Sequence, residues 1–482
     1  MRPHPRRWYV LVVCSGGLFL VVAGITALSV ALPELERSLG ADSADLQWIV
    51  DSYAVVFGGL LLTGGAIGDR IGRRRALTIG FVLLAVSGAI GGVADDVPGV
   101  ILARVVAGLG AALLMPATLS TLTEVFDDDE VPQAIAWWSG VAGGASAIGP
   151  VVAGWLLEVS SWRAVFLANA VGGTVGVIAV AVIVPRLPPA TSGRLDLLGA
   201  FLSTVSIGAV LFVVIEGPGH WTDLPILAAA VVAVVALIGF VRHERRTPEP
   251  MLPGRALRSP RLRTGAFTLV LTAVGFAGVI FVAALLLQFA WGEGPLVTGL
   301  LIAPIGVAEL AVASRVPSLG RRFGIGAVIS SGIVLMACGY VAMAFTPVGS
   351  YAGFVVAGLV AGIGNGLVIP ASVDRIVGDA EPELAGVVAG VNETSIELGA
   401  SLGVAVLGSI QRISLQRELD ADVDSFTEAV DLVGERSAAS AFDTSAGWAL
   451  IAGAVIVSVA FPWARRDLER TAPAEVGQPT RS

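Results

Sequence analysis

Lysine is absent from this sequence of 482 residues, so all 30 of its lysine-or-arginine positions are arginine. This absence excludes the phosphate-binding loop of ATPases and the Schiff base of pyridoxal enzymes, because both need a lysine. Cysteine is scarce as well, and Cys14 and Cys338 lie far apart in apolar runs. We therefore predict no disulfide framework, no metal site and no cofactor, and we do not expect an enzyme.

Charge is the second scarcity. Only 14% of the residues are charged, whereas a soluble protein carries roughly 25%. Hydrophobic residues make up 55% of the chain, the mean hydropathy is +0.83, and there are 60 glycines. Small residues let transmembrane helices approach one another closely. The composition therefore predicts an all-α integral membrane protein embedded in the lipid bilayer, and not a partner of nucleic acid.

Apolar runs long enough to cross a bilayer, about 20 residues each, recur along the chain. The first run covers about 8–32, which is too long for the apolar core of a secretory signal, about 7–15 residues. We predict fourteen transmembrane spans, at residues 8–32, 46–68, 76–94, 99–122, 133–157, 163–184, 195–215, 223–242, 264–290, 297–318, 325–345, 350–371, 386–411 and 445–464.

The arginines support an even number of crossings. If the N-terminus is cytoplasmic, the inner segments hold 24 of the 30 arginines, and Arg104 lies inside a span. The outer segments hold the other five, which are Arg37, Arg163, Arg412, Arg417 and Arg436. Because positive charge accumulates on the cytoplasmic side, we predict a plasma-membrane protein with both termini in the cytoplasm.

A short charged segment joins the second and third spans, and we call it the arginine loop (residues 64–75). Its pattern Gly-x-x-x-Asp-Arg-x-Gly-Arg-Arg resembles the loop between helices two and three of the major facilitator superfamily. The matching residues are Gly65, Asp69, Arg70, Gly72, Arg73 and Arg74. The resemblance implies a conformational latch between two halves of the molecule. A role in topology alone is the alternative, since the arginines hold the loop in the cytoplasm.

The resemblance also implies the domain organisation. Residues 314–324 repeat the arginine loop without its acid, as expected of paired halves. We predict a six-helix bundle in 1–185, two inserted helices and a cytoplasmic linker in 186–263, and a second six-helix bundle in 264–467. The tail at 468–482 is predicted to be disordered.

Fourteen helices are typical of one branch of this superfamily, the drug:proton antiporter-2 family. That family carries a tryptophan and a tyrosine at the spacing of Trp48 and Tyr53, and the resemblance implies substrate contacts there. An interfacial aromatic belt is the alternative for Trp48. Two further polar residues inside the spans, Gln288 and Asn365, complete the predicted substrate contacts.

Arg104 lies within the fourth span, where a charge costs about 2.5–3.5 kcal/mol on insertion scales, so it needs a partner or water. Its surroundings resemble the superfamily's fourth-helix pattern, with Ala107 at the usual glutamine position. The resemblance implies an influence on proton transfer, and a structural ion pair is the alternative.

The fifth span resembles the antiporter motif of the superfamily, which favours export over import. A proline after glycine bends a helix, and this bend lets the helix rock against its neighbour. A glycine-rich packing face is the alternative. The motif residues are Gly140, Gly144, Gly149, Pro150 and Gly154.

One family feature is missing. The aspartate that usually precedes Ala-Leu-Pro in the first helix is replaced by Gly24, so another acid must carry the protons. A carboxyl buried without a partner takes up a proton more readily than one in water. The candidates are Glu309, which is also a candidate anchor for a cationic substrate, and Glu393, Glu397 and Asp51. Glu393 and Glu397 share a helix face, and pairing with the arginine loop is their alternative role.

These observations predict a proton-coupled antiporter, a monomer, that exports amphipathic or cationic organic compounds by alternating access. Its partners are small-molecule substrates and protons. A dedicated exporter of one metabolite or antibiotic is the first alternative. A lipid-handling or regulatory membrane protein without solute turnover is the second.

Overall fold

The computed structural model describes residues 5–127, 130–186, 196–218, 220–247, 259–377 and 385–464, and their regular secondary structure is helical throughout. The helices are α1 (Arg7–Leu39), α2 (Ser43–Ile71), α3 (Arg73–Val93), α4 (Val97–Val125), α5 (Val131–Val159), α6 (Trp162–Ile183), α7 (Leu197–Glu216), α8 (Leu224–Glu244), α10 (Pro260–Leu285), the π-helix η1 (Leu286–Ala290), α11 (Pro295–Ala313), α12 (Val316–Phe323), α13 (Ile325–Ala344), α14 (Tyr351–Val377), α15 (Ala385–Leu419), α16 (Phe426–Val433) and α17 (Glu435–Val459).

Each predicted span overlaps one of the long helices, in the same order along the chain. Within the described residues, 12 helices are long and apolar enough to cross a membrane, or 13 if the bent pair Ser43–Leu61 and Thr63–Ile71 is one span. The remaining long helix, α5, has a shorter apolar part, Gly143–Val159. An all-α, multi-pass membrane architecture is confirmed, and the number of fourteen crossings stays a prediction.

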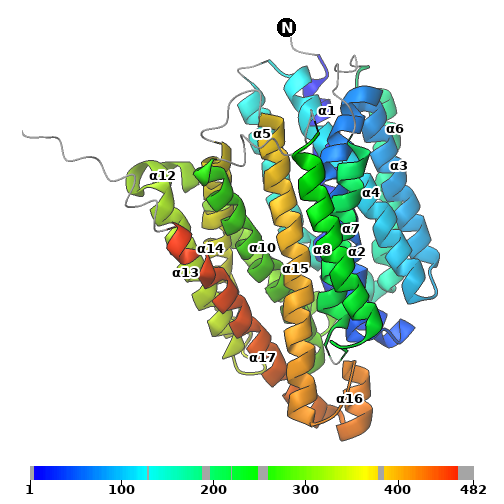
Figure 1. The fold of residues 1–482 in the computed structure, drawn as a ribbon, viewed down its shortest axis with the longest axis vertical. Helices are drawn as coiled ribbons and strands as arrows, with labels where there is room; N and C mark the ends of the chain where they lie inside the picture. Colours follow the sequence, from blue (N-terminus) through cyan, green and yellow to red (C-terminus); the bar gives the residue numbers. More distant parts are fainter. Residues whose placement is uncertain are drawn as a thin grey trace, which may run out of the picture.

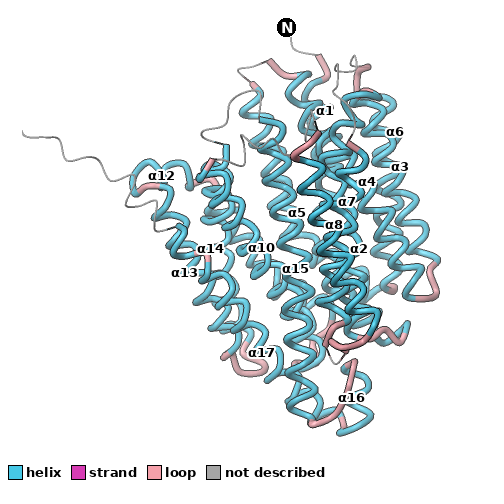
Figure 2. The backbone as a smooth tube through the Cα atoms, in the orientation of Figure 1, coloured by secondary structure: helices cyan, strands magenta, loops and turns pink. Residues whose placement is uncertain are grey.

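The helices run side by side as one elongated bundle (Figure 1, Figure 2). We call the end at which α1 begins the inner end, and the opposite end, where α16 lies, the outer end. Glycine makes a one-residue connection at the inner end. Gly72 alone separates α2 from α3, with φ 90° and ψ 136°. Residues other than glycine rarely adopt this backbone conformation, because their Cβ atom clashes with the backbone.

The long helices form two groups with an additional pair beside them. Helices α1 to α6 pack among themselves, as do α10 to α17, and the two groups meet where α2 contacts α15 and α5 contacts α11. Helices α7 and α8 pack against each other, and α7 also contacts α2 and α15. The predicted domain boundaries stay predictions. The tail at 468–482 and residues 248–258 of the linker lie outside the described residues.

The buried apolar residues differ between the two ends of the bundle. One cluster includes Leu28, Ile49 and Leu157 from the first group together with Leu285 and Leu407 from the second. These first-group residues lie in the outer parts of their helices. A separate cluster, with members such as Cys14, Phe81 and Leu122, belongs to the first group alone and covers its inner and middle parts. The apolar core is therefore shared by both groups at the outer end.

Candidate functional site

A cluster of ionisable side chains is buried where α2, α4 and α15 meet. Asp51 is 0% exposed, Tyr53 3% and Arg104 5%. The Arg104 guanidinium lies 4.5 Å from the centre of the Tyr53 ring, and its Nε donates to the Ile49 carbonyl oxygen at 3.1 Å. A cation over an aromatic face is attracted by the ring quadrupole. Arg104 is thus held by α2, the helix that also carries Asp51.

Asp51 and Arg104 interact electrostatically without a direct ion pair. Within the described chain, both carboxylate oxygens of Asp51 and the Nη2 of Arg104 are buried and have no hydrogen-bond partner. A buried charge without partners costs free energy. A change in the protonation of Asp51, or a new partner for Asp51 or Arg104, would therefore lower the free energy of this arrangement. Unsatisfied buried polar groups with a charged neighbour make this cluster a candidate functional site.

The second group of helices contributes its own acids to the same cluster. Glu397 of α15 interacts electrostatically with Arg104, Tyr53 and Glu393. A Cβ placed on Gly58 of α2 would lie 3.3 Å from the Cβ of Glu397, which shows how closely the two helices approach. Glu393 and Glu397 are half-buried. The structure therefore brings four predicted coupling residues together with Tyr53, at the contact between the two groups.

Glu309 lies in a different place, between α11 and α14. Its carboxyl interacts with the side chain of Asn365, and Tyr340 of α13 lies within electrostatic range of it. Asn365 is 0% exposed, and its amide atoms make no well-aligned hydrogen bond with a described residue. Glu309 thus has a polar neighbour but none of the arginines near Glu397, and the predicted acids fall into two separate sites.

The other predicted substrate residues lie apart from both acidic sites. Trp48 donates from Nε1 to Oε1 of Glu216 in α7 at 2.9 Å and contacts the Phe212 ring. Gln288 lies in the π-helix, is 4% exposed, and donates from Nε2 to the Val30 carbonyl oxygen of α1 at 2.9 Å. Both residues therefore make interhelical contacts, and their role in substrate binding stays a prediction.

The arginine loop is fixed within the first group. Arg73 pairs with Glu124 of α4 at 2.5 Å, donates to the Ser120 carbonyl oxygen at 2.7 Å, and lies 4.0 Å from Asp69. Arg74 donates to the Ala181 carbonyl oxygen of α6 at 2.6 Å. Gly65 faces Pro116 of α4, and Arg70 is exposed on the last turn of α2. The arginine contacts hold the first turn of α3 against α4 and α6, and Gly65 lets α2 approach α4. The latch between the halves stays a prediction.

The glycines of α5 have two different environments. A Cβ on Gly154 would lie 2.5 Å from the Pro295 carbonyl oxygen of α11, and one on Gly149 would overlap Thr26 of α1. Gly299 of α11 in turn packs directly on the backbone of Pro150. A Cβ on Gly140 or Gly144 would meet nothing within 4 Å. Close helix approach thus requires Gly149 and Gly154, at the outer part of α5, but neither Gly140 nor Gly144.

Sequence reasoning missed the contacts that close the outer end. The Thr427 backbone N–H and hydroxyl donate to Oε1 of Glu36 at 3.0 and 3.1 Å, joining α16 to α1. Phe289 stacks on Phe426 with ring centres 4.6 Å apart, and Arg412 pairs with Asp424. Residues 415–433 have an amphipathic pattern in the sequence, but such a pattern does not reveal the partner of the segment.

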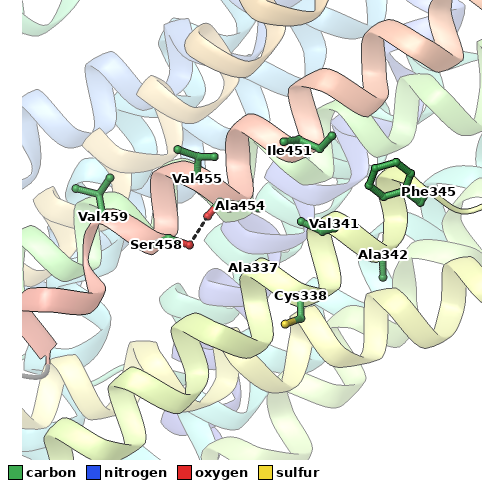
Figure 3. Close-up of a pocket in the computed structure, with 10 residues that line it drawn as sticks. All are labelled: Ala337, Cys338, Val341, Ala342, Phe345, Ile451, Ala454, Val455, Ser458 and Val459. Atoms are coloured by element: carbon green, nitrogen blue, oxygen red, sulfur yellow. Dashed lines mark hydrogen bonds between the residues drawn. The ribbon is translucent and has the colours of Figure 1, made fainter.

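A surface groove of about 780 Å³ lies between α13 and α17. Its lining is almost entirely apolar and includes Cys338, Phe345 and Val455 (Figure 3). Ser458, which also lines the groove, donates its hydroxyl to the Ala454 carbonyl oxygen at 2.7 Å. The groove is lined by no carboxylate, arginine or histidine, so it does not have the chemistry of the two acidic sites.

Two packed groups of helices of membrane-spanning length, with buried charge at their contact, make this a multi-pass membrane protein. The sequence profile of the Major Facilitator Superfamily matches residues 14–404. The chain belongs to this superfamily.

Similar proteins agree with this assignment. The chain is 32% identical over 444 residues to the tetracenomycin C resistance and export protein of Streptomyces glaucescens, covering 91% of this chain and 82% of that protein. It is 31% identical over 415 residues to the multidrug efflux pump LfrA of Mycolicibacterium smegmatis, covering 85% and 82%. A bacterial homologue of the human lysosomal transporter Spinster, solved in an inward-facing and unoccupied conformation, shares the fold with TM-score 0.69 and 15% identity, covering 98% of this chain and 99% of that one.

Proposed function

We propose that this chain is a proton-coupled antiporter that exports amphipathic or cationic organic compounds from the cell by alternating access, as in the drug:proton antiporter-2 family. The observation that carries the proposal is the cluster at the contact between the two helix groups. There Glu397 of α15 lies within electrostatic range of Arg104, which is anchored on α2. A carboxylate in this position links its protonation to the relative movement of the groups.

The coupling follows from simple electrostatics. When Glu397 is ionised, its attraction to Arg104 favours the contact between α2 and α15. When a proton binds the carboxylate, this attraction is lost and the contact weakens, since charge interactions are strong in a site of low dielectric constant. Asp51, whose oxygens accept no hydrogen bond from a described residue, then becomes the remaining counter-ion for Arg104. A membrane potential contributes about 2.3 kcal/mol per charge per 100 mV, which drives proton entry.

Glu309 supports the assignment of cationic substrates. It lies on α11 beside Asn365 of α14, and it forms no ion pair with an arginine of the described chain. An acid with a polar neighbour but no fixed cation can pair with a positively charged compound. Because this site is distinct from the Glu397 cluster, a proton and a substrate need not compete for the same carboxylate.

The names of similar proteins favour export, but they differ in the number of compounds that are exported. One carries the name of a single antibiotic, tetracenomycin C, and another is a multidrug efflux pump. A dedicated exporter of one compound is therefore the second candidate. Orientation in the plasma membrane with both termini cytoplasmic, and function as a monomer, belong to the same proposal.

Transport in proteoliposomes tests the function directly. Purified protein is reconstituted, a proton gradient is imposed, and the movement of a cationic fluorescent dye is followed. We expect transport that depends on the gradient and stops with an uncoupler. Transport that ignores the uncoupler would contradict the proposal. A panel of unrelated dyes separates multidrug export from a dedicated exporter, which would move at most one of them.

A further inference from the structure

The inserted pair of helices, α7 and α8, lies across the contact between the two main groups. In Figure 1 the green pair lies beside the orange α15 and in front of the blue α2, and α7 packs against both helices. Most large apolar side chains of α8 are exposed, with Leu224 at 79% and Val235 at 62%. Helix α8 thus faces lipid, and α7 is the member of the pair that meets the transporter body.

Contacts between α7 and α2 extend along most of α7. At its outer end Glu216 accepts from Trp48 at 2.9 Å. Further inward, a Cβ on Gly208 would lie 3.6 Å from Cγ1 of Val55. Further inward still, Ser203 donates from Oγ to the Gly59 carbonyl oxygen at 3.4 Å. These contacts span residues 203–216, about 20 Å of helix at 1.5 Å per residue.

Contacts between α7 and α15 concentrate toward the outer end. Ser409 donates from Oγ to the Val214 carbonyl oxygen at 2.9 Å. Ala405 is 0% exposed in the small apolar cluster that also contains Leu211 and Ile215 of α7, and Leu402 packs against that cluster. The last two turns of α7 therefore touch the second group of helices, while α2 holds α7 along its length.

We propose that α7 is a lateral seal that moves with the first helix group and releases α15 when the outer end opens. The inference rests on the alternating access proposed above, but it adds the element that covers the seam between α2 and α15. The longer row of contacts belongs to α2, so separation occurs at the shorter row. The seal keeps lipid out of the seam while the outer end is closed.

The inference gives Trp48 a role other than substrate contact. Its indole N–H is directed to Glu216 and its ring contacts Phe212, both on α7. Trp48 is thus a positioning residue that anchors the seal on α2, and it does not touch the acidic sites.

Distances between spin labels test the inference without a transported substrate. Cys14 and Cys338 are replaced by alanine, and labels are placed at exposed outer positions: Val93 of α3, Leu224 of α8 and Val348 between α13 and α14. Distances are recorded at acidic and alkaline pH, with and without a cationic dye. We expect the Leu224–Val348 distance to lengthen together with Val93–Val348, while Leu224–Val93 stays constant.

Two results would overturn the inference. In one, Leu224–Val93 lengthens while Leu224–Val348 stays constant, which assigns the seal to the second group. In the other, no distance changes, so that α7 and α15 do not separate. If the distances change as expected but no dye is moved in liposomes, the transport proposal fails and the seal stands.

A matched pair of variants tests the direction of release. Ser409→Ala removes the hydroxyl by which α15 donates to Val214 of α7 at 2.9 Å and, more weakly, to Gln47 of α2 at 3.4 Å. Ser203→Ala removes a hydroxyl that donates within α7 to Ala200 at 2.9 Å and, more weakly, to Gly59 of α2 at 3.4 Å. We expect Ser409→Ala to raise the ratio of long to short Leu224–Val348 distances by roughly two- to tenfold, the effect of one hydrogen bond. Ser203→Ala is expected to leave that ratio unchanged, and equal effects of the two variants would contradict the proposal.

Discussion

Glu397 is the residue on which proton coupling depends in our proposal. Glu397→Gln keeps the shape of the side chain but cannot exchange a proton, so proton-driven dye transport is expected to fall at least tenfold. Dye binding, measured by fluorescence titration, is expected to stay within about threefold, which is less than 1 kcal/mol. Transport is measured in proteoliposomes with a pH gradient.

The control for this substitution lies on the same helix. Glu418 is exposed near the outer end of α15, and Glu418→Gln is expected to transport normally. A Glu397→Gln variant that still moved dye at the full gradient-dependent rate would remove Glu397 from the coupling step.

Glu309 is expected to act on the charge of the substrate. Glu309→Gln removes the carboxylate beside Asn365 and keeps the packing of α11 on α14. We expect cationic dyes to lose affinity by roughly tenfold or more, about 1.4 kcal/mol, while neutral amphipathic compounds keep theirs. Binding titrations with a cationic and a neutral compound of similar size measure the difference. Equal losses for both compounds would indicate a packing role instead.

At the residue scale, the sequence predicted which side chains are unusual but not which ones meet. Arg104 and the four acids were identified because a charged side chain inside an apolar run is energetically costly and therefore indicates a function. Their separation into two sites depends on helix rotation, since Glu309 faces α14 while Glu397 faces α2. That rotation is set by the packing of whole helices, which a single sequence does not specify.

The glycines of α5 supply a prediction at the scale of one helix. Gly154→Val places a branched side chain against the Pro295 carbonyl oxygen, and overpacking of this kind costs about 1–3 kcal/mol. We expect a lower melting temperature and at least tenfold slower dye efflux, because α5 and α11 can no longer close the outer end.

Gly144 provides the matched control for that prediction. A Cβ there meets nothing within 4 Å, so Gly144→Ala is expected to keep the melting temperature and to transport within about twofold of the unchanged protein, less than 1 kcal/mol. Thermal unfolding and dye efflux measure both variants. Normal efflux by Gly154→Val would show that this approach of α5 to α11 is not needed in the transport cycle.

The positions of the elements were predictable, but several of their contacts were not. Runs of about 20 apolar residues mark helices well, and the long helices lie where the spans were predicted. The sequence did not reveal that α16 would be attached to α1 through Thr427 and Glu36, or that η1 would direct Gln288 to Val30. These are contacts between segments hundreds of residues apart, and no local pattern encodes them.

For the whole molecule, the distribution of arginines predicts an orientation in the membrane. Because 24 of the 30 arginines belong to predicted inner segments, both chain termini are expected in the cytoplasm. A reporter that is active only in the cytoplasm, fused separately to each end, is expected to be active in both fusions. A fusion after Val348, between α13 and α14 at the outer end, serves as the control and is expected to be inactive. Opposite results for the two termini would require an odd number of crossings. In that case the two six-helix bundles would not share one orientation in the membrane, so the contacts of α2 with α15 and of α5 with α11 would not join equivalent halves. The coupling of Glu397 to the movement of the groups would then lose its structural basis.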